Sequence, residues 1–435
     1  MFRLTLLSVF ILSLFLAYPA SAKEENMAES TPKLLRSELG KAGVHGTTRG
    51  HQRKIAYVNG AWVIAYSNDQ GSHMRLSHDG TNWMEPVTFH HNKHSSSYTF
   101  VSWKQRLFLF YTDFHPNQKR IGDGVVVREV VVRDNTIEFK GEPQLVLIDP
   151  QGVDFYISAA VGNNGTFWVQ SRHMGETPPD GEQIRDTRLT HTTKPGRLTE
   201  WAKPIVPIPE TGRGSIVPLV VPLPDGKAYA FARTYQDLWG KLDPNPKANQ
   251  LLGNLFDGTS WGEQPTVLAP RMTHIMGDDR RMSAVFDDKT GILHLLYIDV
   301  ESVLRHRQLH PPYGEDNWQP LLSELGSEVY PTPVHCAVVS LDAHVTPSRV
   351  YMVFGRELEV GKDPRRRTGE LRLAVFDGST WQIEEEPVSE PGSKDYWYPN
   401  VAAEVTAAGE LGILYLKGDS GARLALLRVR PAENK

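Results

Sequence analysis

The sequence has a single cysteine, Cys336, among its 435 residues. One cysteine excludes a disulfide framework within the chain. Its neighbours, Ala337 to Val339, are apolar, which favours a small buried side chain over a nucleophile. Stability must therefore come from a large hydrophobic core, which a chain of this length can form.

Long apolar runs are absent beyond the first 22 residues. That segment contains Arg3, an apolar stretch from Leu4 to Ala17, and the small residues Ala20-Ser21-Ala22. This order predicts a secretory signal peptide cleaved after Ala22, and the apolar stretch is short for a membrane span. We expect a secreted or periplasmic mature chain with no stable membrane span.

Neither sign of charge dominates, with 47 Lys and Arg against 51 Asp and Glu and a formal net charge of −4. Because these charges are mixed along the chain, a nucleic-acid partner is not expected. Helical periodicity is also nearly absent. The remaining pattern is one of short alternating apolar runs bounded by turn formers, which indicates an all-β fold.

A short phrase recurs in this pattern: DGTNW at 79–83, DGTSW at 257–261 and DGSTW at 377–381. Tryptophans that end such turn-rich stretches are Trp83, Trp201, Trp261, Trp318 and Trp381. They are separated by roughly 60 residues or twice that, and such a period is typical of repeat architectures. We expect Asp-Gly to form the turn before an outermost strand and the Trp to pack between neighbouring units.

Each repeat is predicted to hold four short strands, which describes a β-propeller blade. In the first repeat, the first three of these are KIAYV, AWVIAYS and the stretch ending in DGTNW. Innermost strands are predicted to begin near Ile55, Tyr98, Ile157, Ile216, Met282, His335 and Val401. Seven four-stranded antiparallel blades are favoured, with six as the alternative. We expect one propeller domain over 51–435, a monomer, closed by a strand near Lys33–Leu39 from the N-terminal segment 23–50.

The phrase Ser77-His78-Asp79-Gly80-Thr81-Asn82-Trp83 resembles the Asp-box, or BNR repeat, of the sialidase superfamily of propellers. The family pattern has one residue between Asp and Gly, whereas here they are adjacent. Arg53-Lys54-Ile55 is the nearest match to the Arg-Ile-Pro phrase of a sialidase, and Tyr398 is the nearest match to its nucleophile. The layout also resembles secreted BNR-type polysaccharide lyases, in which His, Tyr and Arg act on a uronate sugar.

Ligands of propellers usually bind where the innermost strands begin. Residues just before those strands and at the ends of the second strands, the latter including Arg172 and His173, are rich in Arg, His, Tyr and Asp. The catalytic candidates are Tyr398, Asp154, Tyr156, His335 and His94. The substrate-binding candidates are Arg53, Arg213, Arg233, Arg280, Arg281 and Arg356, because a guanidinium can donate two parallel hydrogen bonds to a carboxylate.

Two chemistries remain open. Hydrolysis needs two carboxyl groups, or a Tyr nucleophile with an acid partner, for which Asp154 and Tyr398 are suited. β-Elimination needs a base, a neutralising Arg and an acid, for which His335, Arg281 and Tyr156 or Tyr398 are suited. No cofactor is predicted, although His90, His91 and His94 leave a metal site open.

The leading hypothesis is a secreted enzyme that cleaves glycosidic bonds of an acidic glycan containing sialic or uronic acid. The alternative is a propeller without catalytic activity that binds a glycan or a protein. Cleavage assays on sialosides and uronate polysaccharides separate the two.

Overall fold

The computed structural model describes residues 34–40, 51–91, 97–112, 124–147, 152–175, 185–209, 215–234, 249–272, 282–301, 303–319, 323–325, 334–357, 369–390, 396–417 and 421–429. These ranges consist mainly of strands, with one-turn 3₁₀ helices at Pro224–Gly226 and Glu315–Asn317. All of them fall within one compact unit, Pro32–Lys435.

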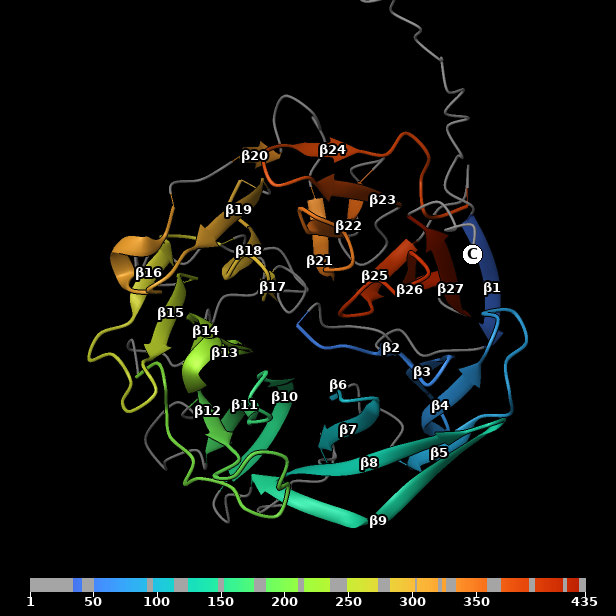
Figure 1. Cartoon of the computed structure of the whole chain (residues 1–435), viewed down its shortest axis with the longest axis horizontal. Helices are drawn as coiled ribbons and strands as arrows, with labels where there is room; N and C mark the ends of the chain where they lie inside the picture. The colour runs from blue at the N-terminus through green and yellow to red at the C-terminus, as the bar shows by residue number, and fades with distance from the viewer. Residues whose placement is uncertain are drawn as a thin grey trace, which may run out of the picture. The chain divides into compact units, whose positions relative to one another are not determined.

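The strands form seven antiparallel sheets, or blades, arranged in a ring (Figure 1). The innermost strands, which number the blades 1 to 7 in chain order, are β2 (Ile55–Val58), β6 (Tyr98–Trp103), β10 (Gly152–Val161), β13 (Ser215–Pro222), β17 (Met282–Asp287), β21 (Val334–Asp342) and β25 (Tyr396–Val401). The second strands are β3 (Ala61–Asn68), β7 (Arg106–Thr112), β11 (Phe167–Gly175), β14 (Ala228–Thr234), β18 (Ile292–Ile298), β22 (Arg349–Glu357) and β26 (Glu410–Lys417).

The outer half of each blade completes the sheet. The third strands are β4 (Gly71–Ser77), β8 (Val125–Arg133), β12 (Arg185–His191), β15 (Leu251–Phe256), β19 (Leu304–Leu309), β23 (Gly369–Phe376) and β27 (Gly421–Arg428). The outermost strands are β5 (Val87–His90), β9 (Thr136–Leu147), β16 (Thr266–Ala269), β20 (Ser323–Leu325), β24 (Trp381–Ile383) and β1 (Leu34–Gly40). Blade 3 has three strands, and isolated bridges from Leu189 to Ile205 and from Thr192 to Trp201 continue its outer edge. Seven blades are therefore confirmed, and the six-bladed alternative is wrong.

Strand β1 closes the ring as the fourth strand of blade 7. It pairs antiparallel with β27, and Leu34 lies opposite Leu427. The predicted closure by the N-terminal segment is confirmed. Blade 7 consequently has no unpaired outer edge at β27, which would otherwise offer a template for association.

The repeated Asp-Gly phrases form equivalent turns between third and outermost strands. Asp79 accepts hydrogen bonds from the backbone N–H groups of Thr81 and Asn82, both at 2.8 Å. Asp257 and Asp377 repeat this arrangement with the residues two and three positions later. The carboxylates thus satisfy the turn N–H groups, which explains why the phrase recurs.

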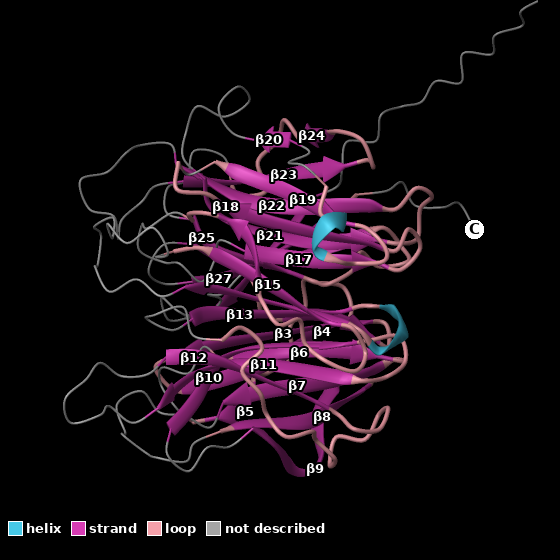
Figure 2. Cartoon of the chain, turned by 90° about the vertical axis from the view of Figure 1, so that its left-hand side faces the viewer, coloured by secondary structure: helices cyan, strands magenta, loops and turns pink. Residues whose placement is uncertain are grey.

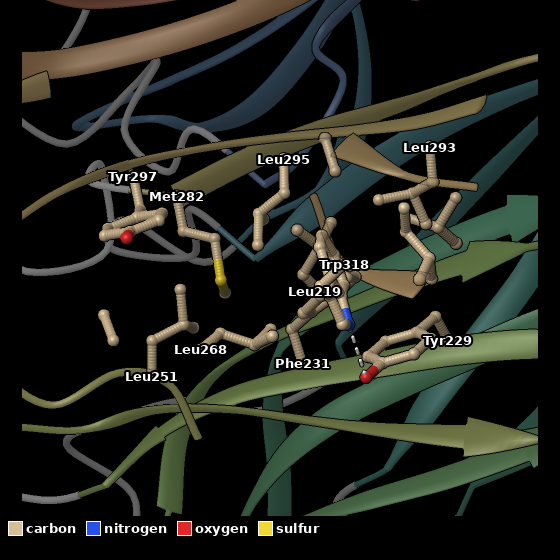
Figure 3. Close-up of a cluster of buried hydrophobic side chains, with 14 of the residues drawn as sticks. Leu219, Tyr229, Phe231, Leu251, Leu268, Met282, Leu293, Leu295, Tyr297 and Trp318 are labelled. Carbon is tan, nitrogen blue, oxygen red and sulfur yellow. Dashed lines mark hydrogen bonds between the residues drawn. The ribbon is translucent and has the colours of Figure 1, made fainter. Parts of the chain in front are cut away.

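The tryptophans at the ends of these turn-rich stretches pack against the preceding blade. Trp318 of blade 5 donates from Nε1 to the Tyr229 hydroxyl of blade 4 at 3.1 Å, within a buried cluster shared by both blades (Figure 3). Trp381 of blade 6 packs against His306 of blade 5 in the same way. In blade 2, where the Trp is missing, Phe139 packs against the core of blades 1 and 2. The aromatic at this position therefore joins neighbouring blades.

A short axial segment, residues 51–54, crosses the middle of the ring. Gln52 Nε2 donates to the Ile157 carbonyl of blade 3 at 3.0 Å. The Arg53 guanidinium donates to carbonyls of Val339 in blade 6 at 2.6 Å and Ala284 in blade 5 at 3.4 Å. Asn400 of blade 7 bonds the backbone on both sides of Arg53. The Arg53 backbone N–H also donates to Thr99 Oγ1 of blade 2 at 2.8 Å. One segment therefore connects five blades to blade 1.

The ring has two ends. At the turn end lie the seven connections between the first and second strands; Figure 2 shows described loops, in pink, at one side of the strands. At the opposite end, which we call the loop end, the inner strands begin and the second strands finish.

Candidate functional site

Four inner strands share a register irregularity at the loop end. The pairing shifts between Phe155 and Ser158 in blade 3, and between Ile216 and Leu219 in blade 4. It shifts again between Val334 and Cys336 in blade 6, and between Trp397 and Asn400 in blade 7. Such bulges bend the strand and redirect side chains, and they occur often beside active sites.

Three catalytic candidates occupy these bulges. Tyr156 lies in that of blade 3, His335 in that of blade 6 and Tyr398 in that of blade 7. The backbone therefore brings them to corresponding positions of three blades. The side chains of His335 and Tyr398 lie outside what the structure describes, so their roles stay predictions.

Tyr156 is the described member of this set. Its backbone has a φ of 55°, a left-handed conformation that an aromatic residue adopts only when its surroundings impose it. The Arg172 guanidinium lies 5.5 Å from the centre of the Tyr156 ring and 5.0 Å from that of Phe155. Both Tyr156 and Arg172 are half-buried. A phenol and a guanidinium thus lie together at the loop end.

Asp154 lies behind this pair, fully buried on the other face of blade 3. Its Oδ1 accepts a hydrogen bond from the Ser171 hydroxyl at 2.7 Å and lies 3.4 Å from His173 Nδ1. His173 is itself 2% exposed and packs against Gly152. Asp154 is therefore placed to orient a neighbouring side chain, which differs from the direct role proposed with Tyr398.

Arg172 and His173, which lie beside Tyr156 and Asp154, were not among the catalytic or substrate-binding candidates from the sequence. A usable signal existed in the hairpin turn that contains Gly162 and Gly165. Counting outward from this turn, where Val161 lies opposite Phe167, would place His173 opposite Phe155. In the structure the register shifts by one residue, so that His173 lies opposite Asp154 and Arg172 opposite Phe155. The bulge that contains Tyr156 causes this shift, and counting residues from the turn does not reveal it.

The arginine candidates are distributed differently. Arg233 is 1% exposed and lies opposite Ile216 in blade 4. Arg53 belongs to the axial segment and lines a cavity at the turn end. Arg356 lies on β22 opposite Val334, but its side chain is outside the description. Arg213, Arg280 and Arg281, together with His94, lie outside the described residues and stay predictions.

The histidine run begins at the edge of blade 1. His90 ends the outermost strand β5, and its ring contacts Tyr111 of blade 2 with centroids 6.1 Å apart. His91 follows directly, exposed. Among the described residues, no group of three or more His, Cys, Asp or Glu side chains could hold a metal ion. In the same residues, no helix is suited to spanning a membrane.

Comparisons with solved structures identify the fold. A polysaccharide lyase of family PL25, an ulvan lyase, has a TM-score of 0.55 and 12% identity over 90% of this chain and 95% of its own. The same lyase bound to -[GlcA(1-4)Rha3S]- gives a TM-score of 0.55 with 11% identity over equal shares. The sialidase of Trypanosoma rangeli has a TM-score of 0.47 and 15% identity, over 91% of this chain and 60% of its own.

The chain is thus a seven-bladed β-propeller whose fold is similar to that of the ulvan lyase. No protein-family model matches its sequence, and no curated protein matches it. At these identities the likeness defines the fold, and the chemistry has to be argued from the loop end.

Proposed function

We propose that the chain cleaves an acidic glycan by β-elimination beside a uronate carboxylate, with Tyr156 and Arg172 at the reacting sugar. The observation that carries this proposal is the strained bulge that holds the Tyr156 ring beside the Arg172 guanidinium. Strain of this kind persists where the surrounding structure fixes a functional side chain.

Elimination divides into three tasks. A base removes the proton on the carbon beside the carboxylate, and the released electron pair forms a double bond to the next carbon. The bond from that carbon to the glycosidic oxygen breaks, and the leaving oxygen takes a proton from an acid. Arg172 suits the carboxylate, whose charge grows as the proton leaves. The Tyr156 phenol suits proton transfer, and His94 or His335 remains a candidate for the other proton.

Hydrolysis is less well supported by the described residues. A glycosidase needs carboxyl groups, or a Tyr with a carboxylic partner, at the scissile bond. Asp154, the carboxyl candidate from the sequence, is 0% exposed and faces Ser171 and His173 instead. A buried carboxylate in this position can orient His173 but cannot reach a sugar.

The comparisons support the same direction. The ulvan lyase of similar fold was solved with a glycan that contains glucuronate. A glucuronate-containing, acidic polysaccharide is accordingly the first substrate class to test. A monomer acting outside the cell, after removal of residues 1–22, is part of the proposal. Mass determination of the mature N-terminus tests that cleavage, and an intact Met1 in the exported protein would contradict it.

The decisive assay follows the ultraviolet absorbance of an unsaturated uronate while purified protein acts on glucuronate polysaccharides and, separately, sialosides. We expect absorbance and reducing ends to rise together on the former. Tyr156→Phe should lower kcat by about 10²- to 10⁴-fold, the usual contribution of a positioned acid or base. Tyr313→Phe is the matched control, because Tyr313 is a buried tyrosine packed among blades 4 and 5. It does not belong to the loop-end group, which we define as Tyr156, Arg172 and Asp154.

Other outcomes are equally informative. Reducing ends without absorbance mean hydrolysis and overturn the elimination mechanism. Glycan binding without any cleavage means a binding propeller, the alternative from the sequence. Full activity in folded Tyr156→Phe places the chemistry elsewhere on the ring.

A further inference from the structure

A second concave site lies at the turn end of the ring. A cavity of about 1010 Å³ is lined by the first connections and inner strands of all seven blades. Its volume lies at the upper end of the range usual for small-molecule sites. Tyr156, Arg172 and Asp154 do not line it. The cavity is therefore separate from the loop-end group.

Arg53 is the buried cation of this cavity, whose lining also includes Lys104 at the connection of blade 2. Its guanidinium donates to two neutral carbonyls, those of Val339 and Ala284. Within the described part of the chain, no carboxylate forms an ion pair with it. Burial lowers the pKa of Arg53 to about 10, and no acidic neighbour offsets that effect.

The Arg53 guanidinium still has N–H donors with which it can bind a ligand. A guanidinium has five N–H donors in a planar fork, and the two carbonyls occupy two of them. Buried charges in proteins are normally paired with an opposite charge. The free donors of Arg53 and its unpaired charge together suit an anionic group that enters the cavity.

The rest of the lining selects against highly charged anions. Asp288 of blade 5 and Glu404 of blade 7 both line the cavity. Burial raises the pKa of each carboxyl, and each also feels the negative charge of an acidic neighbour. Asn163 of blade 3 hydrogen-bonds Asp288. Such groups accept hydrogen bonds from hydroxyls but repel additional negative charge, a common basis of specificity.

We propose that this cavity binds a small sugar acid with one carboxylate and several hydroxyls, such as a hexuronate. The carboxylate would pair with Arg53, and the hydroxyls would bond Asn163, Asp288 and Glu404. This site stands apart from the cleavage reaction and does not depend on it.

The test is a calorimetric titration with glucuronate, glucose and inorganic phosphate. It uses Arg172→Gln protein, so that weakened binding at the loop end does not obscure the result. We expect glucuronate to bind at least tenfold more tightly than glucose, which has the hydroxyls but no charge. Phosphate should bind more weakly than glucuronate, because the carboxyls at the cavity repel its second charge.

Two variants separate binding from stability. Arg53→Gln should abolish glucuronate binding, but it also removes contacts between blades. Asn163→Ala leaves the Arg53 bonds in place and should weaken binding about fivefold, the effect of losing one hydrogen bond. Circular dichroism confirms that each variant is folded.

Several results would overturn the proposal. These are no glucuronate binding in Arg172→Gln protein, binding unchanged in folded Arg53→Gln and Asn163→Ala, or glucose bound as tightly as glucuronate. Lyase activity that fails while this binding persists would affect only the loop-end proposal, so the two can be told apart.

Discussion

Two buried histidines between blades 5 and 6 show how a single proton position can affect an interface. Trp381 Nε1 donates to His306 Nδ1 at 3.2 Å, so this nitrogen carries no proton. The His306 proton must then be on Nε2, which lies 3.1 Å from His294 Nδ1. The two rings stack with centroids 5.3 Å apart. The arrangement requires both imidazoles to be neutral.

Burial lowers the pKa of His294 to about 4 and that of His306 to about 3, from 6.5. Between these values the unfolded chain binds more protons than the folded one. The stabilisation is therefore complete above pH 6.5 and is lost as the pH falls toward 4. For His294 alone the loss is on the order of 3 kcal/mol.

Urea unfolding across this pH window checks the prediction. The free energy of unfolding should decrease on acidification, and the decrease should be smaller in the double variant His294→Gln, His306→Gln. His344→Gln, at an exposed histidine, serves as control. An unchanged pH dependence in the double variant would show that other groups dominate.

At the scale of elements, the Asp-Gly turns offer a matched pair of substitutions. Gly80 and Gly378 both have positive φ, of 73° and 102°. A methyl group at Gly80 would overlap the Leu426 side chain of blade 7, whereas none of the surveyed atoms lies within 4 Å at Gly378. The two glycines thus share a backbone requirement but differ in their surroundings.

Gly378→Ala should cost about 1–2 kcal/mol, the strain of a left-handed alanine. Gly80→Ala should cost a further 1–3 kcal/mol, because Leu426 must move within a packed interface. Chemical denaturation measures both. Equal losses would mean that the interface between blades 7 and 1 adapts freely.

The elements also show what sequence can predict. The Trp phrases located the ends of third strands because their turn chemistry is local, and Asp79, Asp257 and Asp377 repeat it unchanged. Inner strands were placed less accurately where a bulge intervenes: β10 begins at Gly152 rather than near Ile157. Bulges depend on contacts between blades, and a local pattern does not contain them.

At the scale of the whole molecule, strand β1 connects three blades. Arg36 donates to carbonyls of Pro387, Val388 and Ser389 that follow β24 of blade 6. Ser37 bonds Gly80 and Trp83 of blade 1. Through β27 the same strand completes blade 7.

Arg36→Ala should lower the free energy of unfolding by about 1–3 kcal/mol, since it leaves partly buried carbonyls without a donor. Glu38→Ala, on the same strand, removes an ion pair with Arg423 in which the Glu side chain is 79% exposed. Such a pair contributes under about 1 kcal/mol. Thermal unfolding compares the two, and a larger loss in Glu38→Ala would contradict this account of closure.

The site was predictable only in part at this scale. Inner-strand starts gave Tyr156, His335 and Tyr398 because ring geometry places them at one end. Arg53 was expected with them, but its side chain extends along the axis to Val339 and Ala284. The direction of a long side chain in a central channel depends on which carbonyls lack partners, and that is a property of the assembled ring.

Closure through β1 has a consequence for the order of synthesis. Leu34 leaves the ribosome almost 400 residues before its partner Leu427. Translation proceeds at roughly 5–20 residues per second, so this strand waits tens of seconds without its sheet. Closure of the ring is thus a long-range capture, and the emergence of β27 sets the earliest moment at which it can occur.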